Sequence, residues 1–172
     1  MLKRLLLLLL VCMAAVNSGA QTSVREANLK AAFIYNFTKY IEWDSSNYAN
    51  DFVIGVIGSS PVTSALMEIA RTNQAKNKKI VIRVFNKPED ISFCHILFIP
   101  QKIPYPLSSV LAKVGKGTLT ISEEPGFAKQ GTAFNFKITN DKLKFEVNLA
   151  KLYSAGLKAG SQLLKLAEIV DE

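Results

Sequence analysis

The strongest folding signal in the chain is TAFNFKITNDKLKFEVNLAKLYSAGLKAGSQLLKL, residues 132–166. Apolar and polar residues alternate over residues 134–139 and again over residues 142–147, with Asn140 and Asp141 between the two runs. Successive strand side chains point to opposite faces, and Asn and Asp tolerate the positive φ angles of a two-residue turn. The stretch therefore predicts a β-hairpin with one polar face and one apolar face, the latter formed by Phe134, Phe136, Ile138, Leu143, Phe145 and Val147.

A two-stranded hairpin is marginal alone, so its apolar face needs a covering layer. Residues 26–43 can supply it, because their apolar positions recur with the period of a helix: Ala27, Leu29, Phe33, Ile34, Phe37, Tyr40 and Ile41. Lys30 interrupts this stripe, and we expect its aliphatic stem to lie along the apolar face with the amine in water. The stripe predicts a helix that covers either a sheet face or a partner subunit.

Between that helix and the hairpin, strand-like and helix-like segments alternate. Strands are expected at residues 52–57, 80–85, 93–99 and 118–122, and helices at residues 62–71 and 107–114. Residues 93–99 are apolar almost throughout, which is typical of a central parallel strand buried on both faces. The predicted fold class is α/β: a single three-layer domain with a mixed sheet, the C-terminal hairpin as its antiparallel edge, and short C-terminal helices after Asn148 and Ser161.

The N-terminus has the form of a secretory signal peptide. Lys3 and Arg4 precede an apolar run over residues 5–16, and small residues lead up to Gln21, so we expect cleavage after Ala20 and a mature domain of residues 21–172. A retained signal anchor and a lipoprotein acylated at Cys12 are alternatives. The run is shorter than the roughly 20 residues that span a bilayer, and no later run reaches that length. We therefore expect a periplasmic protein that is not membrane-spanning.

Charge and cysteine content narrow the possible partners. The formal net charge of +7 falls to +5 once Lys3 and Arg4 are removed. Outside the cytoplasm this excess favours acidic envelope polymers, lipid head groups or an acidic protein over nucleic acid, and a solvated basic surface with no partner is the alternative. Cys94 is the one cysteine of the mature chain, and its apolar surroundings predict a buried thiol, with a disulfide between subunits as the alternative.

The sequence lacks the common catalytic motifs. It contains no GxSxG, HExxH or CxxC, and its single histidine, His95, lies within an apolar run where a packed side chain is expected. Glu123 and Glu124 are adjacent, so in an extended segment they would point apart. We predict no enzymatic activity, no catalytic residues, no cofactor and no metal site.

Two connecting segments suggest a ligand pocket. Residues 58–61, GSSP, join a strand to a helix, and the free amides of such a turn can hold an anion. Residues 123–131, EEPGFAKQG, form a loop that combines charge, a turn and an aromatic residue that we expect to be exposed. Together they support a second hypothesis, a periplasmic small-molecule sensor or carrier.

Three separated motifs resemble the YfiR family of bacterial periplasmic proteins. They are AAFIYNFTKYIEW at residues 31–43, FKITNDKLKFEVNL at residues 136–149 and AGLKAGSQLLKLAEIV at residues 155–170. The match spans nearly the whole mature chain. Two departures stand out: the cysteine pair of the family's namesake is absent from residues 127–135, which puts redox control of the loop in doubt, and Asp44 replaces a proline that is common after the tryptophan.

The resemblance implies a non-enzymatic α/β periplasmic domain that often dimerises. It implies binding to the periplasmic part of an inner-membrane diguanylate cyclase, or a similar receptor, which is held inactive so that cyclic di-GMP falls and biofilm formation is restrained. By position in the family fold, it places partner contacts at Phe127, Phe134, Glu146 and Leu152. Core packing for Phe134 and Leu152, and a lysine pair for Glu146, are the structural alternatives.

Overall fold

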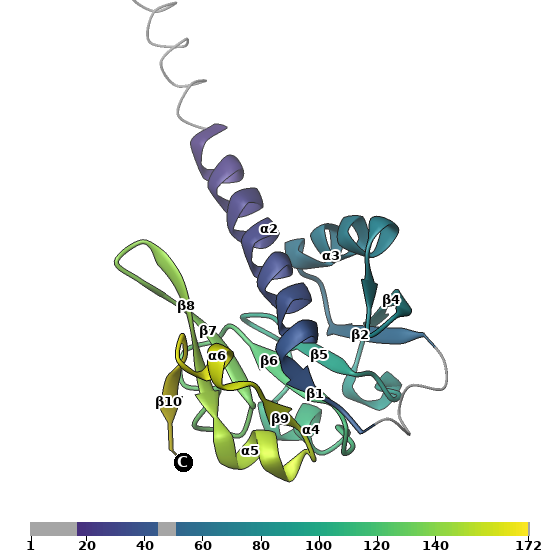
Figure 1. Ribbon diagram of the computed structural model, residues 1–172. Helices are drawn as coiled ribbons and strands as arrows, with labels where there is room; N and C mark the ends of the chain where they lie inside the picture. Colours follow the sequence, from purple (N-terminus) through teal and green to yellow (C-terminus); the bar gives the residue numbers. More distant parts are fainter. Residues whose placement is uncertain (1–16, 45–50, 172) are drawn as a thin grey trace, which may run out of the picture.

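The computed structural model describes residues 17–44 and 51–171, and its centre is an eight-stranded mixed sheet (Figure 1). A separate antiparallel pair joins β1 (Ile41–Glu42) to β9 (Lys158–Ala159). The mixed α/β fold class is thereby confirmed. In spatial order the strands of the large sheet are β10 (Glu168–Val170), β8 (Lys142–Asn148), β7 (Phe134–Thr139), β6 (Leu119–Ser122), β5 (Ile96–Ile99), β2 (Phe52–Ile57), β4 (Lys78–Phe85) and β3 (Gln74–Ala75).

The middle of the sheet is parallel and fully buried. β4, β2, β5, β6 and β7 run in the same direction, and every residue of β2, β5 and β6 is buried. Strands covered on both faces carry continuous apolar runs, which explains the composition of this region. The expected strand at residues 93–99 is therefore central, although it begins only at Ile96.

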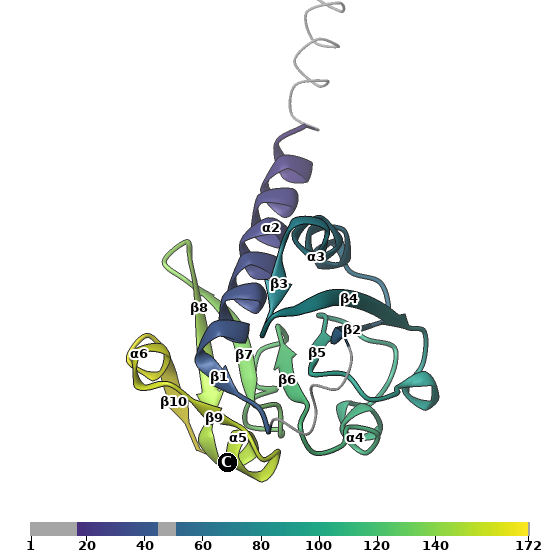
Figure 2. The ribbon, with the colours of Figure 1, turned by 45° about the vertical axis from the view of Figure 1, so that its right-hand side comes forward.

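Helices cover the two faces of the sheet unequally (Figure 2). α2 (Asn17–Tyr40) and α3 (Pro61–Thr72) pack on one face, and the short α4 (Leu107–Leu111) packs on the other. The Ser60 side chain caps α3 as expected, because its Oγ accepts a hydrogen bond of 3.2 Å from the Val62 amide. Over residues 17–44 and 51–171, the remaining helices are the 3₁₀ turn Pro88–Asp90, α5 (Leu149–Ser154) and α6 (Ser161–Leu164).

The hairpin forms in the predicted register. Asn140 and Asp141 have φ angles of 51° and 57°, and Phe136 lies opposite Phe145. The Phe37 ring of α2 meets the Phe145 ring edge-on at 5.1 Å between centroids. The apolar face is not buried to its tip: Ile138 is 56% exposed, because the end of the hairpin reaches away from α2 (Figure 1).

The structure corrects the ends of the first helix. α2 begins at Asn17 rather than residue 26, because the polar leader contains no proline and can continue the helix. It ends at Tyr40, whose carbonyl accepts a 2.8 Å hydrogen bond from the Gly160 amide, and the next two residues form β1. Of the predicted signal peptide, residues 1–16 lie outside the described residues, and the expected cleavage after Ala20 falls within α2.

Two further expectations were wrong at the ends of elements. α4 stops at Leu111 instead of continuing to residue 114. The hairpin is not the edge of the sheet, because β10 follows α6 and pairs in parallel with β8, with Ile169 opposite Val147. A three-residue strand shows no alternation long enough to be recognised from the sequence.

The single histidine and Cys94 are structural, as predicted. His95 is buried, its Nδ1 accepts a 3.0 Å hydrogen bond from the Val53 amide, and its ring stacks on Phe52. Cys94 is a free, buried thiol, and burial raises its pKa to about 12. Within residues 17–44 and 51–171, the helices lack the combination of length and hydropathy needed to cross a bilayer.

Candidate functional site

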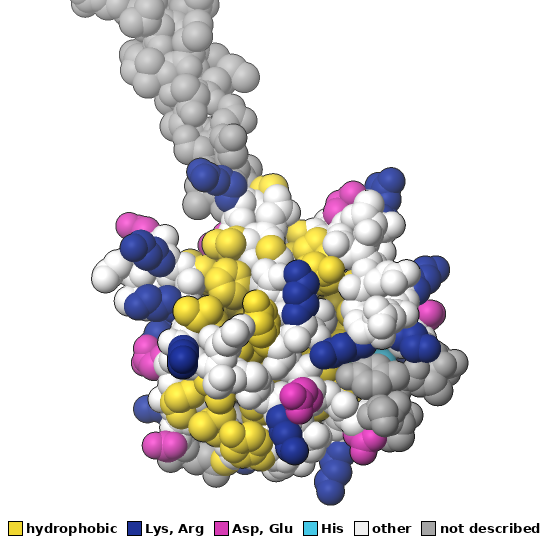
Figure 3. All heavy atoms as spheres, viewed as in Figure 1, with side chains coloured by type: hydrophobic (Ala, Val, Ile, Leu, Met, Phe, Trp, Pro, Cys, Tyr) yellow, Lys and Arg dark blue, Asp and Glu magenta, His cyan; other side chains and the backbone are white. Residues whose placement is uncertain are grey.

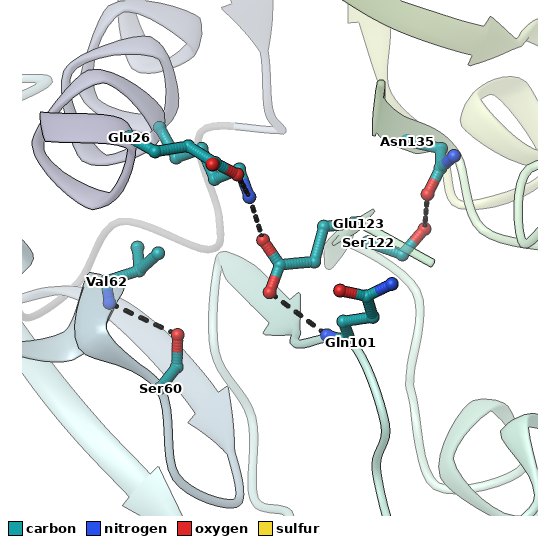
Figure 4. Close-up of polar contacts among 8 residues, drawn as sticks. Glu26, Ser60, Val62, Gln101, Ser122, Glu123 and Asn135 are labelled. Atoms are coloured by element: carbon teal, nitrogen blue, oxygen red, sulfur yellow. Dashed lines mark hydrogen bonds and ion pairs between the residues drawn. The ribbon is translucent and has the colours of Figure 1, made fainter. Parts of the chain in front are cut away.

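A cavity of about 450 Å³ opens where α2, the end of β6 and the hairpin meet. Its walls mix five charged side chains with apolar ones, and Figure 4 shows part of its polar wall. The size is within the range of small-ligand pockets. The lining residues are Glu26, Lys30, Gln101, Glu123, Pro125, Gly126, Asn135, Phe136, Lys137, Ile138, Leu143 and Glu146.

Lys30 forms the centre of the first charged group. Its Nζ lies 2.5 Å from Glu123 Oε2 and 2.5 Å from Glu26 Oε1. The other oxygen of the Glu123 carboxylate, Oε1, accepts a 3.0 Å hydrogen bond from the Gln101 amide, and Figure 4 shows Glu123 between Glu26 and Gln101. Lys30 therefore joins α2 to the ends of β5 and β6, and the expectation that its amine would lie in water was wrong.

The charge of Lys30 is stabilised by these partners. Burial by itself would lower the pKa of this amine, but the hydrogen bonds and charges of Glu123 and Glu26 outweigh that effect and leave the pKa raised. The ammonium form of Lys30 is thus held between the carboxylates of Glu123 and Glu26. In this geometry Lys30 positions the two carboxylates and does not transfer protons.

A buried chain of polar side chains runs through the sheet beside the cavity. Ser122 Oγ lies 2.7 Å from Thr132 Oγ1 and 2.7 Å from Asn135 Oδ1. Asn135 Nδ2 donates to Glu146 Oε2 at 3.1 Å. Each buried group thereby has a partner, which rigidifies this end of the sheet.

A second charged group lies on the polar face of the hairpin. Lys137 Nζ is 3.5 Å from Glu146 Oε1 and 2.6 Å from Glu168 Oε2, so it connects the hairpin to β10. The hydrogen bond with Glu168 is the main cause of the raised pKa of Lys137 and of the lowered pKa of Glu168.

A wider cleft of about 770 Å³ continues outward from the cavity, between α2 and the tip of the hairpin. Hydrophobic side chains gather there, in the hollow between the hairpin and α2 (Figure 3). The two spaces share Glu26, Ile138 and Leu143. The cleft is lined by Arg25, Glu26, Asn28, Leu29, Ala32, Ile138, Asp141 and Leu143.

The loop at residues 123–131 is firmly attached to the hairpin. Ala128 is fully buried, and its carbonyl accepts a 3.0 Å hydrogen bond from Asn148 Nδ2. Phe127 is half-buried against the core cluster under α4, so the expected exposed aromatic was wrong. The loop thus presents Pro125 and Gly126 to the cavity on a rigid base.

The structure does not gather the four residues predicted for partner binding into one surface. Phe134 and Leu152 are fully buried in the core under α2. Glu146 lines the cavity on the polar face of β8, and Phe127 packs in the opposite core cluster. The GSSP turn at residues 58–61 does not line the cavity either, so it shares no pocket there with the loop at residues 123–131.

Sequence reasoning singled out Glu146 and the loop at residues 123–131 but missed most of the other residues that build this site. Lys30 was detectable as a charge inside an apolar stripe, but its partner Glu123 is 93 positions away. Ser122 and Thr132 gave no signal, because isolated hydroxyls follow no period. In the described part of the chain, no group of three or more His, Cys, Asp and Glu side chains is arranged to hold a metal ion.

A family model described as YfiR/HmsC-like matches residues 27–168. That range includes most of α2, the hairpin and every residue that lines the cavity except Glu26. No curated protein matches the chain.

Proposed function

Because the chain belongs to the YfiR/HmsC-like family, we propose that it binds the periplasmic part of an inner-membrane diguanylate cyclase, or a similar receptor, and holds it inactive. Cyclic di-GMP signalling falls as a result. The family is regulatory and periplasmic in general, and the proposal extends that role to a specific class of partner.

One structural observation carries the proposal: the cavity and the adjoining cleft form a rigid, mixed apolar and charged surface. Its charged side chains are already paired with one another, as in Lys30 with Glu123 and Lys137 with Glu146. Paired charges suit recognition, since they orient a partner without supplying a reactive group. We propose Glu146 as a contact, and Phe127 as a residue that supports the neighbouring loop.

Regulation follows from differential binding. A protein that binds the inactive conformation of a cyclase more tightly than the active one shifts the population toward the inactive form. About 5.5 kcal/mol of preference would convert a 1:99 mixture into 99:1, which is within the reach of a standard protein interface. We propose residues 21–172 as the mature regulator, which acts as a monomer or a homodimer.

The test measures cyclic di-GMP and binding together. Cells lacking the protein are expected to contain more cyclic di-GMP, and crosslinking in the envelope is expected to capture an inner-membrane protein with a cyclase domain. Glu146→Lys should weaken that capture, whereas Glu68→Lys, on the exposed surface of α3, should not. Equal melting temperatures of the two variants would show that folding is unchanged. Recovery of self-dimers alone would overturn the proposal.

The 450 Å³ cavity also supports a second candidate, a small-molecule sensor or carrier. A ligand that binds only the folded state raises its apparent stability. A thermal-shift screen of envelope metabolites and cell-wall fragments tests this: a rise in melting temperature that Glu146→Lys abolishes would favour the sensor, and no rise would favour the regulator alone.

A further inference from the structure

β7 extends beyond its neighbour β6 and leaves one edge open. β6 pairs with β7 only as far as Ser122, which lies opposite Asn135. β7 continues to Thr139, and its other edge stays paired with β8 as far as Lys142. Among the described residues, no strand therefore covers the β6 side of residues 136–139.

The hairpin register identifies which backbone groups face this open edge. The Asn148 amide donates to the Ala133 carbonyl at 2.8 Å, so Ala133 points its carbonyl toward β8. Along an antiparallel strand this orientation alternates, so residues 135, 137 and 139 also face β8. The amide and carbonyl of Ile138 then point to the open side.

We propose that an extended segment of the regulated membrane protein adds to this edge as a new strand, in line with β6. The inference rests on the proposed function and specifies its contact. Main-chain hydrogen bonds to the amide and carbonyl of Ile138 supply affinity, as in other cases of strand addition. Four residues of such a segment extend about 13 Å, enough to follow β7 to its tip.

The side chains on the two faces of the open edge of β7 indicate which residue types the added segment carries. On the α2 side, Leu29, Ala32 and Leu143 line the cleft, which favours apolar side chains there. On the opposite face Lys137 and Glu146 favour polar ones. Successive strand residues alternate between faces, so the segment alternates apolar and polar residues.

The charge of the cavity lining sets a further requirement on the added segment. The cavity at the inner end of the edge has three carboxylates, those of Glu26, Glu123 and Glu146, against the amines of Lys30 and Lys137. This net negative lining belongs to a chain whose overall charge is +7. The segment is therefore expected to carry a lysine or arginine at the end that enters the cavity.

The edge at the far side of the sheet is protected where β3 pairs with Lys78 and Lys79 of β4. β3 has only two residues, and Lys76, Lys78 and Lys79 lie beside it. Lysines and short strands discourage edge pairing in natural sheets. The open edge of β7 bears the exposed Ile138 instead, and a cavity and a cleft border it.

The first test removes one backbone donor. Ile138→Pro abolishes the amide that faces the open edge and spares the ladder to β8, while Ile138→Val keeps both the amide and the shape. With the purified periplasmic part of the captured cyclase as probe, Ile138→Pro should raise the Kd about tenfold or more, and Ile138→Val should change it less than about threefold. Melting temperatures establish that both variants fold.

A second pair of variants probes the cleft wall without touching β7. Leu29→Glu puts a charge in the cleft, and Val24→Glu puts the same charge on an exposed position of the same helix, outside the residues that line it. Only Leu29→Glu should weaken binding. In the wild-type protein, exchange of the Ile138 amide with deuterium should slow at least about tenfold when the cyclase fragment binds.

The outcomes separate the two proposals. If the wild-type protein does not bind the cyclase fragment, the proposed function fails and the strand addition fails with it. If it binds, but Ile138→Pro binds equally well or the Ile138 amide gains no protection, only the strand addition is overturned. Capture of a second copy of this chain at the edge would also overturn it, in favour of self-association.

Discussion

The Nζ of Lys30 lies 2.5 Å from Oε2 of Glu123, and this ion pair links two segments that are 93 positions apart in the chain. Both side chains are only 12% exposed. The pair fixes α2 over the end of β6, and with it the separation of α2 from the hairpin. This charged contact adds to the apolar packing of Phe33 and Phe37 on the hairpin, which also sets the width of the cleft.

Replacing Lys30 by Met should destabilise the fold by about 2 kcal/mol, because the Glu123 carboxylate keeps its buried position without its counter-ion. Urea unfolding measures the change. Arg71→Met is the matched control, since it removes a pair with Glu68 whose side chains are 74% and 71% exposed, and it should cost less than about 0.5 kcal/mol. Equal losses in the two variants would contradict a structural role for Lys30.

The same contact predicts a dependence on alkaline pH. A group whose pKa is higher in the folded state contributes stability that is complete below its unfolded pKa and is lost as pH rises through the folded value. The pKa of Lys30 is raised above 10.5, so its contribution should disappear above that pH. As pH rises above 10.5, the free energy of unfolding should fall more in the wild-type protein than in Lys30→Met. Parallel curves would refute this.

Gly55 is predicted to tolerate no larger side chain. A Cβ at this position would lie 2.6 Å from Phe85 Cε2 and 3.1 Å from Cys94 Sγ in the core under α4. Gly55→Ala should cost about 1–3 kcal/mol in unfolding free energy. A Cβ at Gly115 would meet nothing within 4 Å, so Gly115→Ala should be neutral within about 0.5 kcal/mol.

Cys94 should be inert in the folded protein. Its pKa is raised from 9.0 to about 12 by burial, so the reactive thiolate is scarce at neutral pH. Iodoacetamide at about pH 8 should leave the native thiol unmodified and alkylate it readily in denaturant. Rapid alkylation without denaturant would show that the segment before β5, which carries Cys94, opens on its own.

Much of the fold could be predicted because its signals are local. The alternation around Asn140 and Asp141 predicted the hairpin register, and Ser60 followed by Pro61 predicted the start of α3. The apolar run containing Ile96 predicted a buried central strand. Each signal depends on neighbours a few positions apart, the range in which periodicity and capping act.

Glu146 and the loop at residues 123–131 were named from the sequence, but the contacts of the candidate site could not be predicted, because they join distant parts of the chain. Lys30 has a polar partner that no spacing rule relates to it, and Ser122, Thr132 and Asn135 meet only after β6 and β7 pair. The three residues of β10 are recognisable as a strand only beside β8. Short elements and long-range polar contacts depend on the finished sheet, which no local pattern encodes.

The surroundings of the single tryptophan give the protein an internal optical reporter. Trp43 Nε1 donates a 3.2 Å hydrogen bond to the His95 carbonyl, and its ring meets Phe52 edge-on at 5.3 Å between centroids. The buried indole therefore joins the segment that follows β1 to the start of β2 and to the residue before β5. Fluorescence excited near 295 nm arises from this one residue, so a red shift in its emission would report the moment at which the segment after β1 separates from Phe52 and His95, without any label attached to the chain.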